Sequence, residues 1–184
     1  MIIIDISQEV FGARTYGVDP KPGYSRFKLI AQGGSCNSTE FHMGVHNGTH
    51  VDAPWHVLDD GKTVDQMRLE DCIGPCVVLE GEGWERRIPD GCTRVLVRTE
   101  EFMTIEQARA LTAKGIRLVG TICQKIGERD VHEEFLSRDI VILEGLDLSK
   151  APAGEAFLCA QPLNLGGAEG APVRAVLLYG VTEA

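Results

Sequence analysis

The sequence predicts an α/β protein built on a mixed sheet with few helices. Short runs of apolar and β-branched residues recur along the chain, and several are apolar throughout, like strands that are buried on both faces. Between residues 94 and 143 these runs alternate with helical patterns, which is typical of parallel strands joined by helical crossovers. The length of 184 residues fits one domain with its own core, so we expect a single domain over residues 1–184.

The predicted strands are short and spread over the whole chain. We expect them over residues 2–6, 76–79, 94–97, 118–121, 140–143 and 175–179. Two helices are predicted between the later strands. The first has Thr104 as its N-cap and Gln107 at the capping-box position, and it ends at Gly115. The second covers residues 130–137 and turns Phe135 and Leu136 towards the core.

The net charge and the cysteine content indicate which partners and which cellular compartment to expect. Lys plus Arg number 18 and Asp plus Glu number 27, so the net charge is −9. Such an acidic surface repels phosphate backbones and anionic lipid, so we expect neither nucleic acid nor a membrane as a partner. No apolar run approaches the roughly 20 residues of a membrane span, and the start of the chain lacks the basic segment of a signal peptide. We expect a cytoplasmic protein whose six cysteines are free thiols.

Histidines gather in one short segment of the chain. Four of the five histidines lie between residues 42 and 56, and Asp52 lies among them. Imidazole is the commonest metal-binding side chain, and a neighbouring carboxylate suits a hard or borderline cation. A single histidine in such a segment is more often an ordinary core or surface residue, but four of them together with a carboxylate favour a metal site.

The spacing within this segment favours a strand and a tight turn over a helix. His46 and His50 are four residues apart, but Gly48 and Pro54 oppose a helix, and no Glu occupies the HExxH position. Gly48 allows a turn that brings both imidazoles to one point. On an extended segment, His50 and Asp52 share a face. We therefore predict that His46, His50 and Asp52 are donors to one centre.

This pattern alone does not assign four further residues to the centre. His56 is close enough to reach the same centre without being obliged to bind it, and His42, which precedes the bend, is expected to be structural. His132 lies on the second predicted helix, and Glu144 ends a buried strand. A carboxylate in that position is costly unless it is paired, hydrogen-bonded or bound to a metal. His132 and Glu144 are therefore either members of the site or ordinary surface and ion-pair residues.

The histidine segment resembles the signature of a known family. Residues 46–56, HNGTHVDAPWH, are similar to the HxGTHxDxPxH motif of the cyclase family, which includes bacterial kynurenine formamidase (arylformamidase) and isatin hydrolase. Further similar segments extend over nearly the whole chain. They are IDIS at residues 4–7, DGKTVD at 60–65, IGPCVV at 73–78, EGLDL at 144–148, QPLN at 161–164 and GAPVRA at 170–175. His132 and Glu144 are 12 residues apart, like the second pair of metal ligands in that family.

The resemblance implies a swivelling β/β/α fold and a metal-dependent hydrolase of a small amide, for which N-formylkynurenine is the best-known family substrate. It implies that His46, His50 and Asp52 bind one metal, and that Asp52, His132 and Glu144 hold a second. Zinc is the expected ion, with one or two ions per subunit, and manganese is the alternative.

The resemblance also implies roles for two neighbouring aromatic residues. His56 is expected to be catalytic and to protonate the leaving nitrogen, and its alternative role is to orient Asp52. Trp55 is expected to line an aryl-binding pocket in contact with the substrate, and its alternative role is packing. Family members form oligomers, so we expect a homodimer or a homotetramer.

One segment, residues 120–127, departs from the family pattern. Ile122 stands where the family has Asp, and Lys125 where it has Ser. Lys125 can contact an anionic substrate carboxylate or be a solvated lysine, and Cys123 can approach the metals or be a buried thiol. These departures leave two alternatives open. One is hydrolysis of a cyclic amide such as isatin, or of another small acylated compound. The other is metal binding without turnover.

Overall fold

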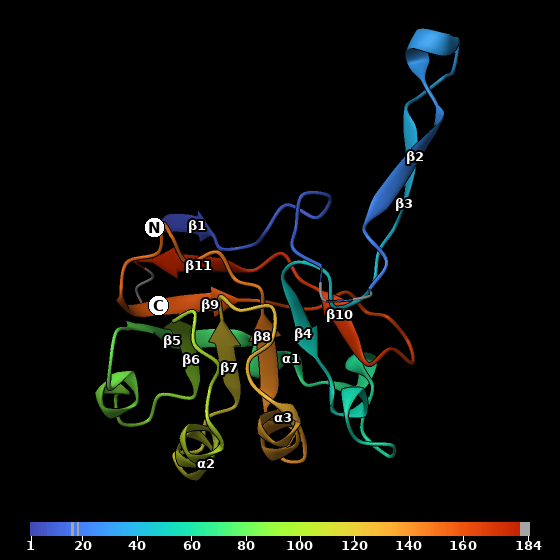
Figure 1. Cartoon of the computed structure of the whole chain (residues 1–184). Coiled ribbons are helices and arrows are strands. Elements are labelled where there is room, and N and C mark those ends of the chain that lie inside the picture. Colours follow the sequence, from blue (N-terminus) through green and yellow to red (C-terminus); the bar gives the residue numbers. More distant parts are fainter. Residues whose placement is uncertain (16, 18, 181–184) are drawn as a thin grey trace.

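The body of the molecule is one mixed sheet of nine strands, in the order β1-β11-β9-β5-β6-β7-β8-β4-β10 (Figure 1). The structure is a computed structural model that describes residues 1–15, 17 and 19–180. The strands of this sheet are β1 (Ile2–Asp5), β4 (His50–Asp52), β5 (Ile73–Glu80), β6 (Arg94–Arg98), β7 (Leu118–Thr121), β8 (Val141–Glu144), β9 (Gly154–Cys159), β10 (Gly170–Pro172) and β11 (Val176–Tyr179).

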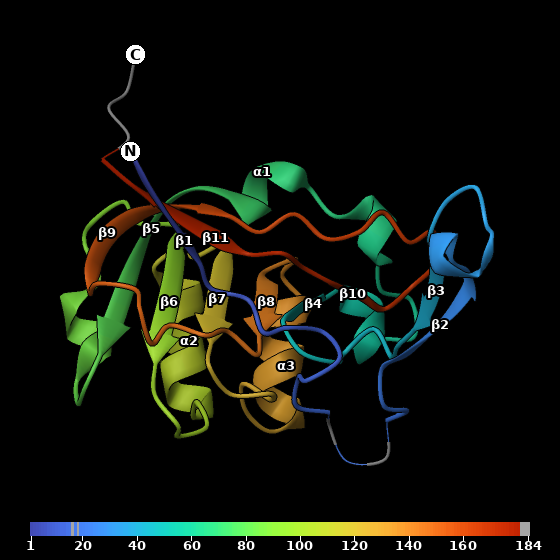
Figure 2. The same ribbon diagram turned by 90° about the horizontal axis from the view of Figure 1, so that it is seen from above.

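Strands β5 to β8 form the parallel centre of the sheet, and the strands on both sides of it pair antiparallel. Helix α2 (Ile105–Ala113) connects β6 to β7, and helix α3 (Arg129–Leu136) connects β7 to β8. Both helices lie against the same face of the sheet (Figures 1 and 2). The predicted alternation of strands and helices, and with it the mixed α/β fold with few helices, is confirmed.

Both predicted helices are present, with ends within two residues of the predicted ones and with the expected inner faces. At the start of α2, the Thr104 hydroxyl accepts from the Gln107 N–H at 3.3 Å, and the Gln107 side chain accepts from the Thr104 N–H at 3.0 Å. This is the predicted capping box. Helix α3 begins at Arg129, one residue before the predicted start, and it buries Phe135 and Leu136 as expected.

Two apolar clusters cover the two faces of the parallel strands. Towards the helices, Val95 and Val119 pack in a cluster that includes Leu111 of α2. On the opposite face, Leu96 and Leu118 pack with residues of the flanking antiparallel strands. Because neighbouring residues of one strand enter opposite clusters, β6 and β7 are buried on both faces, as their apolar sequences predict.

A two-stranded arm projects from this body (Figure 1). Strand β2 (Gly23–Lys28) pairs antiparallel with β3 (Ser38–His42), and a short 3-10 turn at Ile30–Gln32 lies between them. The sequence does not predict the arm, because its strands are exposed on both faces and lack the alternation of a half-buried strand. Strands β9 and β10 are also absent from the prediction. Strand β4 has only three residues and is predicted only as an extended segment after the turn at Gly48.

The remaining helical elements are short and lie in connections. They are α1 (Leu69–Cys72) and 3-10 turns at Pro54–His56, Val64–Gln66 and Trp84–Arg87. Among the described residues, no helix combines the length and the apolar character needed to cross a bilayer.

Candidate metal centre

Pairing between β4 and β8 brings three of the predicted ligands together. The antiparallel register sets His50 opposite Glu144, and His50 Nε2 lies 3.4 Å from Glu144 Oε2. His50 and Asp52 are two residues apart on β4, and the same Nε2 lies 3.5 Å from Asp52 Oδ1. The structure therefore places His50 and Asp52 on one face of the strand, as the spacing predicts, and all three side chains are buried.

A tight turn before β4 returns His46 to the same point. Gly48 adopts a left-handed backbone with φ +68°, which residues with a Cβ rarely take. The Thr49 hydroxyl fixes the turn by donating a hydrogen bond to the Gly145 carbonyl at 2.6 Å. As a result, His46 Nδ1 lies 2.9 Å from Asp52 Oδ1. The structure thus has the predicted bend at Gly48.

Helix α3 presents His132 to the cluster from the opposite side. Its Nδ1 lies 3.0 Å from the Glu128 carbonyl, so the proton is on Nδ1 and Nε2 faces the two carboxylates. That Nε2 is 3.3 Å from Glu144 Oε1 and 3.7 Å from Asp52 Oδ2. Glu144 Oε1 also accepts the Ile126 N–H at 2.7 Å, which holds this carboxylate in place.

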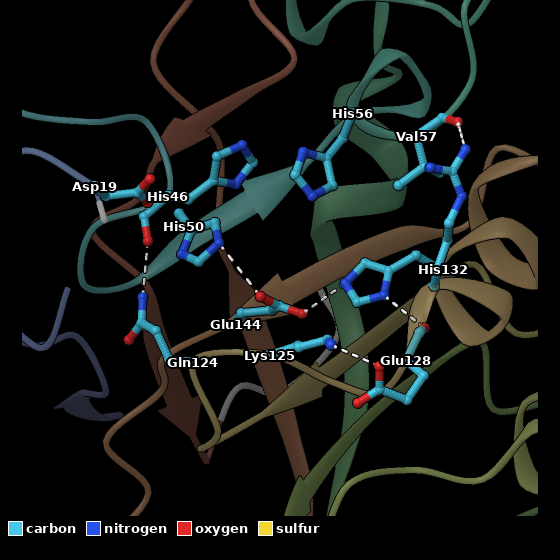
Figure 3. Close-up of a pocket in the computed structure, with 11 residues that line it drawn as sticks. Asp19, His46, His50, His56, Val57, Gln124, Lys125, Glu128, His132 and Glu144 are labelled. Carbon is cyan, nitrogen blue, oxygen red and sulfur yellow. Dashed lines mark hydrogen bonds and ion pairs between the residues drawn. The ribbon is translucent and has the colours of Figure 1, made fainter. Parts of the chain in front are cut away.

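His46, His50, His132 and Glu144 line one pocket with a volume of about 280 Å³ (Figure 3). His56, at the end of the Pro54–His56 turn, points into it, and its ring centre lies 4.2 Å from that of His46. Besides the four histidines and Glu144, the wall of the pocket is formed by Asp19, Val57, Gln124, Lys125, Glu128 and Arg129. The pocket thus combines a buried donor cluster with a charged rim.

The donor atoms fall into two groups that share Asp52. One group is His50, Asp52 and Glu144, and the other is His46, Asp52 and His56, with the ligand atoms in each group within 4.8 Å of one another. A carboxylate common to both groups agrees with the shared carboxylate that the family resemblance implies. The grouping differs from the expected ligand sets in two respects. His56 rather than His50 accompanies His46, and His50 rather than His132 accompanies Glu144.

Two unpartnered atoms show that the cluster fits a divalent cation. Asp52 Oδ2 and His46 Nε2 are buried, and neither has a hydrogen-bond partner among the described residues. A buried polar atom without a partner is costly, so a positive ion between these groups would compensate both. Imidazole nitrogens with carboxylate oxygens are the donors that zinc and related ions take.

Burial and hydrogen bonding set the protonation of the cluster. Burial disfavours the ionised form of Asp52, but hydrogen bonds from His46 and His50 outweigh it and hold the pKa of this carboxyl well below its ordinary value. Burial also opposes a charge on His50, yet hydrogen bonds with Asp52 and Glu144 raise the pKa of its imidazole to about 10. A cation that binds His50 Nε2 at neutral pH therefore displaces a proton.

One predicted site residue lies elsewhere. Trp55 is not among the residues that line the pocket, and 44% of its surface is exposed, so its contact with the substrate stays a prediction. Successive residues of a 3-10 turn point about 120° apart, so Trp55 and His56 point in different directions, and His56 lines the pocket. His42 lies on the arm, outside the pocket, as expected of a structural residue. Cys123 Sγ donates to the Thr99 carbonyl at 3.4 Å and lines a neighbouring cavity.

Two residues near the cluster had no role in the sequence-based prediction. Glu169 Oε1 lies 3.6 Å from His46 Nε2, because Gly170 pairs with Asp52 across β4 and β10. Gln124 lines the pocket and reaches the turn before β4. Neither belongs to a local pattern of donors, and only the pairing of distant segments shows that they are near the site.

Loss of a central donor is expected to abolish tight metal binding. In Asp52→Ala and His50→Ala variants, the remaining groups no longer share a common carboxylate or a buried imidazole, so the zinc retained after dialysis should fall to near zero. Metal per chain is measured by atomic emission spectrometry. His42→Ala, which removes an imidazole from the arm, is the matched control and should retain the wild-type amount. Full retention of zinc by Asp52→Ala would contradict the assignment.

Comparison with known proteins agrees with this geometry. A family model described as "Putative cyclase" matches residues 4–126. The chain is 32% identical over 206 residues to a kynurenine formamidase from Sphingopyxis alaskensis, with 95% of this chain and 97% of that protein covered.

Two solved structures extend the comparison to the fold. One, described as a predicted metal-dependent hydrolase from Bacillus stearothermophilus, is 28% identical, with a TM-score of 0.80 over 96% of this chain and 97% of that one. Isatin hydrolase A from Labrenzia aggregata is 23% identical and shares the fold, with a TM-score of 0.82 over 96% of this chain and 93% of that one. Sequence, fold and donor geometry agree, and the chain belongs to the cyclase family of metal-dependent hydrolases.

Proposed function

We propose that the protein hydrolyses a small amide, with an N-formylkynurenine-type arylformamide as its substrate class. The observation that carries this proposal is the convergence of histidines and carboxylates on the buried Asp52, at a pocket of about 280 Å³. Clusters of this kind hold the divalent cations that promote hydrolysis of acyl compounds. The identity of 32% to a kynurenine formamidase, over 95% of the chain, supports the arylformamide.

The proposed metal is zinc, with one or two ions per chain, and manganese is the alternative. Imidazole suits zinc, and carboxylates accommodate either ion. Asp52 would be shared, with His46 and His50 on one side and His132 and Glu144 on the other. A divalent cation held by these residues supplies an activated water at neutral pH and polarises the amide carbonyl.

His56 is proposed to move the proton that amide hydrolysis requires. Burial lowers the pKa of its imidazole below the ordinary value, against the opposing charge of Asp52, so the ring is neutral at neutral pH. His56 accepts a proton from the attacking water as the water oxygen bonds to the amide carbon. It then donates that proton to the leaving nitrogen as the C–N bond breaks.

Release of formate from N-formylkynurenine by the zinc-loaded protein tests the proposed reaction. We expect turnover of this compound, and none by Asp52→Ala protein prepared in the same way. Faster opening of isatin than hydrolysis of N-formylkynurenine would instead make a cyclic amide the substrate class. Bound metal without hydrolysis of either compound, or of other small acylated amides, would contradict an enzymatic function.

A His56→Ala variant is expected to separate catalysis from metal binding. Loss of a proton-transfer group typically costs about 10²–10⁴-fold in rate, so kcat should fall by this factor while metal content stays near the wild-type value. Both quantities are measured on the same preparation. A parallel loss of metal would show that His56 is a ligand, as its proximity to His46 and Asp52 permits.

We also propose that the arm joins copies of the chain into a homodimer or a homotetramer. Four large apolar side chains on the arm are exposed, namely Tyr24, Phe27, Ile30 and Phe41. A two-stranded hairpin by itself is marginally stable in water, and clustered exposed apolar groups mark interaction sites. Most soluble oligomers are symmetric assemblies of identical chains, which supports a second copy as the partner.

Sedimentation velocity at micromolar concentration tests the role of the arm. The wild-type protein should sediment as a dimer or a tetramer, and Phe27→Glu, which places a charge in the apolar surface of the arm, should sediment as a monomer. Leu69→Glu changes an exposed apolar residue of the body and is the matched control, which should assemble like the wild type. A monomeric wild-type chain would contradict the proposal.

We also propose that the protein acts in the cytoplasm. All six cysteines are free thiols, as predicted. This supports a compartment that keeps thiols reduced, where disulfides are rare.

A further inference from the structure

The side chain of Gln124 spans two segments of the metal centre. It lies in the loop after β7, at the carboxyl ends of the parallel strands, and lines the pocket. Its Nε2 donates to two carbonyls of the turn before β4, to that of His46 at 2.8 Å and to that of Gly48 at 2.9 Å. Figure 3 shows the first of these bonds. One side chain thus ties the loop after β7 to the turn that presents His46 and His50.

The chemistry of the two acceptors determines the orientation of this amide. Carbonyl oxygens accept hydrogen bonds and cannot donate them, so a flipped amide would place its own oxygen against two others. A primary amide offers two N–H groups on one nitrogen and can serve both carbonyls at once. Gln124 Oε1 is buried without a partner among the described residues, which costs free energy that the two bonds on Nε2 offset.

The Gly48 carbonyl that Gln124 holds also orients His50. His50 Nδ1 lies 3.0 Å from this oxygen, and because the oxygen only accepts, Nδ1 carries the proton. Once a cation displaces the second proton of the ring, the lone pair of Nε2 lies on the side that faces Asp52 and Glu144. Hydrogen bonds of this kind fix the tautomer and the direction of histidines that bind metals.

Close packing confines the same carbonyl from another direction. Gly145 lies against the Gly48 carbonyl so closely that a Cβ at position 145 would overlap its oxygen. The Gly145 N–H in turn donates to the Cys123 carbonyl at 2.8 Å, which links this contact to the residue before Gln124. The loop after β7 therefore contacts the turn directly through the Gln124 side chain and indirectly through Gly145, which follows β8.

We propose that Gln124 is a positioning residue of the metal centre, which holds the turn at residues 46–48 so that His46 and His50 meet at Asp52. The inference rests on the proposed function in one respect, that the cluster binds a divalent cation. Gln124 acts through the turn rather than on the ion, because both N–H groups of its nitrogen are engaged by backbone carbonyls. Loss of a group that orients metal ligands typically costs about 10–100-fold in metal affinity.

Substitution of Gln124 by methionine tests this role. Methionine has a similar length and no N–H donor, so Gln124→Met removes both hydrogen bonds with little change in volume. The dissociation constants for Zn²⁺ and Mn²⁺ are measured by competition with a chromogenic chelator, and the unfolding temperature of the metal-free protein by calorimetry. We expect metal affinity about 10–100-fold below that of the wild type, with an unfolding temperature near the wild-type value.

A matched control separates positioning from general stability. Gln107→Met removes a hydrogen bond between a glutamine side chain and the backbone at the start of α2, outside the pocket of the metal centre, and should leave metal affinity unchanged. Gln124→Asn keeps the amide but shortens the side chain, so this variant should lose part of the metal affinity. It replaces Gln124→Met as the test if the methionine variant fails to fold.

The possible outcomes distinguish this inference from the proposed function. Dissociation constants within about twofold of the wild type in both Gln124 variants would overturn the inference alone, since 10–100-fold is expected. A loss of affinity in Gln107→Met equal to that in Gln124→Met would overturn it as well. A wild-type chain that binds neither Zn²⁺ nor Mn²⁺ would overturn the metal centre itself, and the role of Gln124 with it.

Discussion

The site depends on a carboxylate that the fold has removed from water. Asp52 is 1% exposed, and burial of an ionised carboxylate is costly unless positive charge or hydrogen bonds compensate. His46, His50 and His132 approach it from a turn, a strand and a helix. Without a cation, a proton on His50 supplies part of the compensation. The surrounding structure therefore maintains a place for positive charge.

The parallel half of the fold could be predicted from sequence because short local patterns of residues determine its strands and helices. Strands β6, β7 and β8 are apolar on both faces, and α2 carries a capping box. The length of each apolar run and the capping residues of the helix are therefore enough to predict these elements. The same holds for the first part of the site. His46, Gly48, His50 and Asp52 lie within one short segment, so their convergence needs only a turn and the two-residue period of a strand.

The rest of the fold and of the site depends on pairing between segments distant in the sequence, which no local pattern of residues predicts. The sequence of strand β4 does not indicate its neighbours in the sheet, and its place between β8 and β10 brings Glu144 and Glu169 near the histidines. His132 and Glu144 gained their assignment from the family resemblance, because each alone has an ordinary interpretation. The arm has no buried face, and the direction of Trp55 is a detail of one turn, so neither could be read from apolar spacing.

The register of β4 also constrains how this site can vary in evolution. In a strand, side chains alternate between the two faces, so a single residue gained or lost between His50 and Asp52 would turn one donor away from the other. Insertions in the arm, between Gly23 and His42, leave that register untouched. Length variation among related chains should therefore concentrate in the arm and the outer loops, and the three-residue strand should tolerate no change in length.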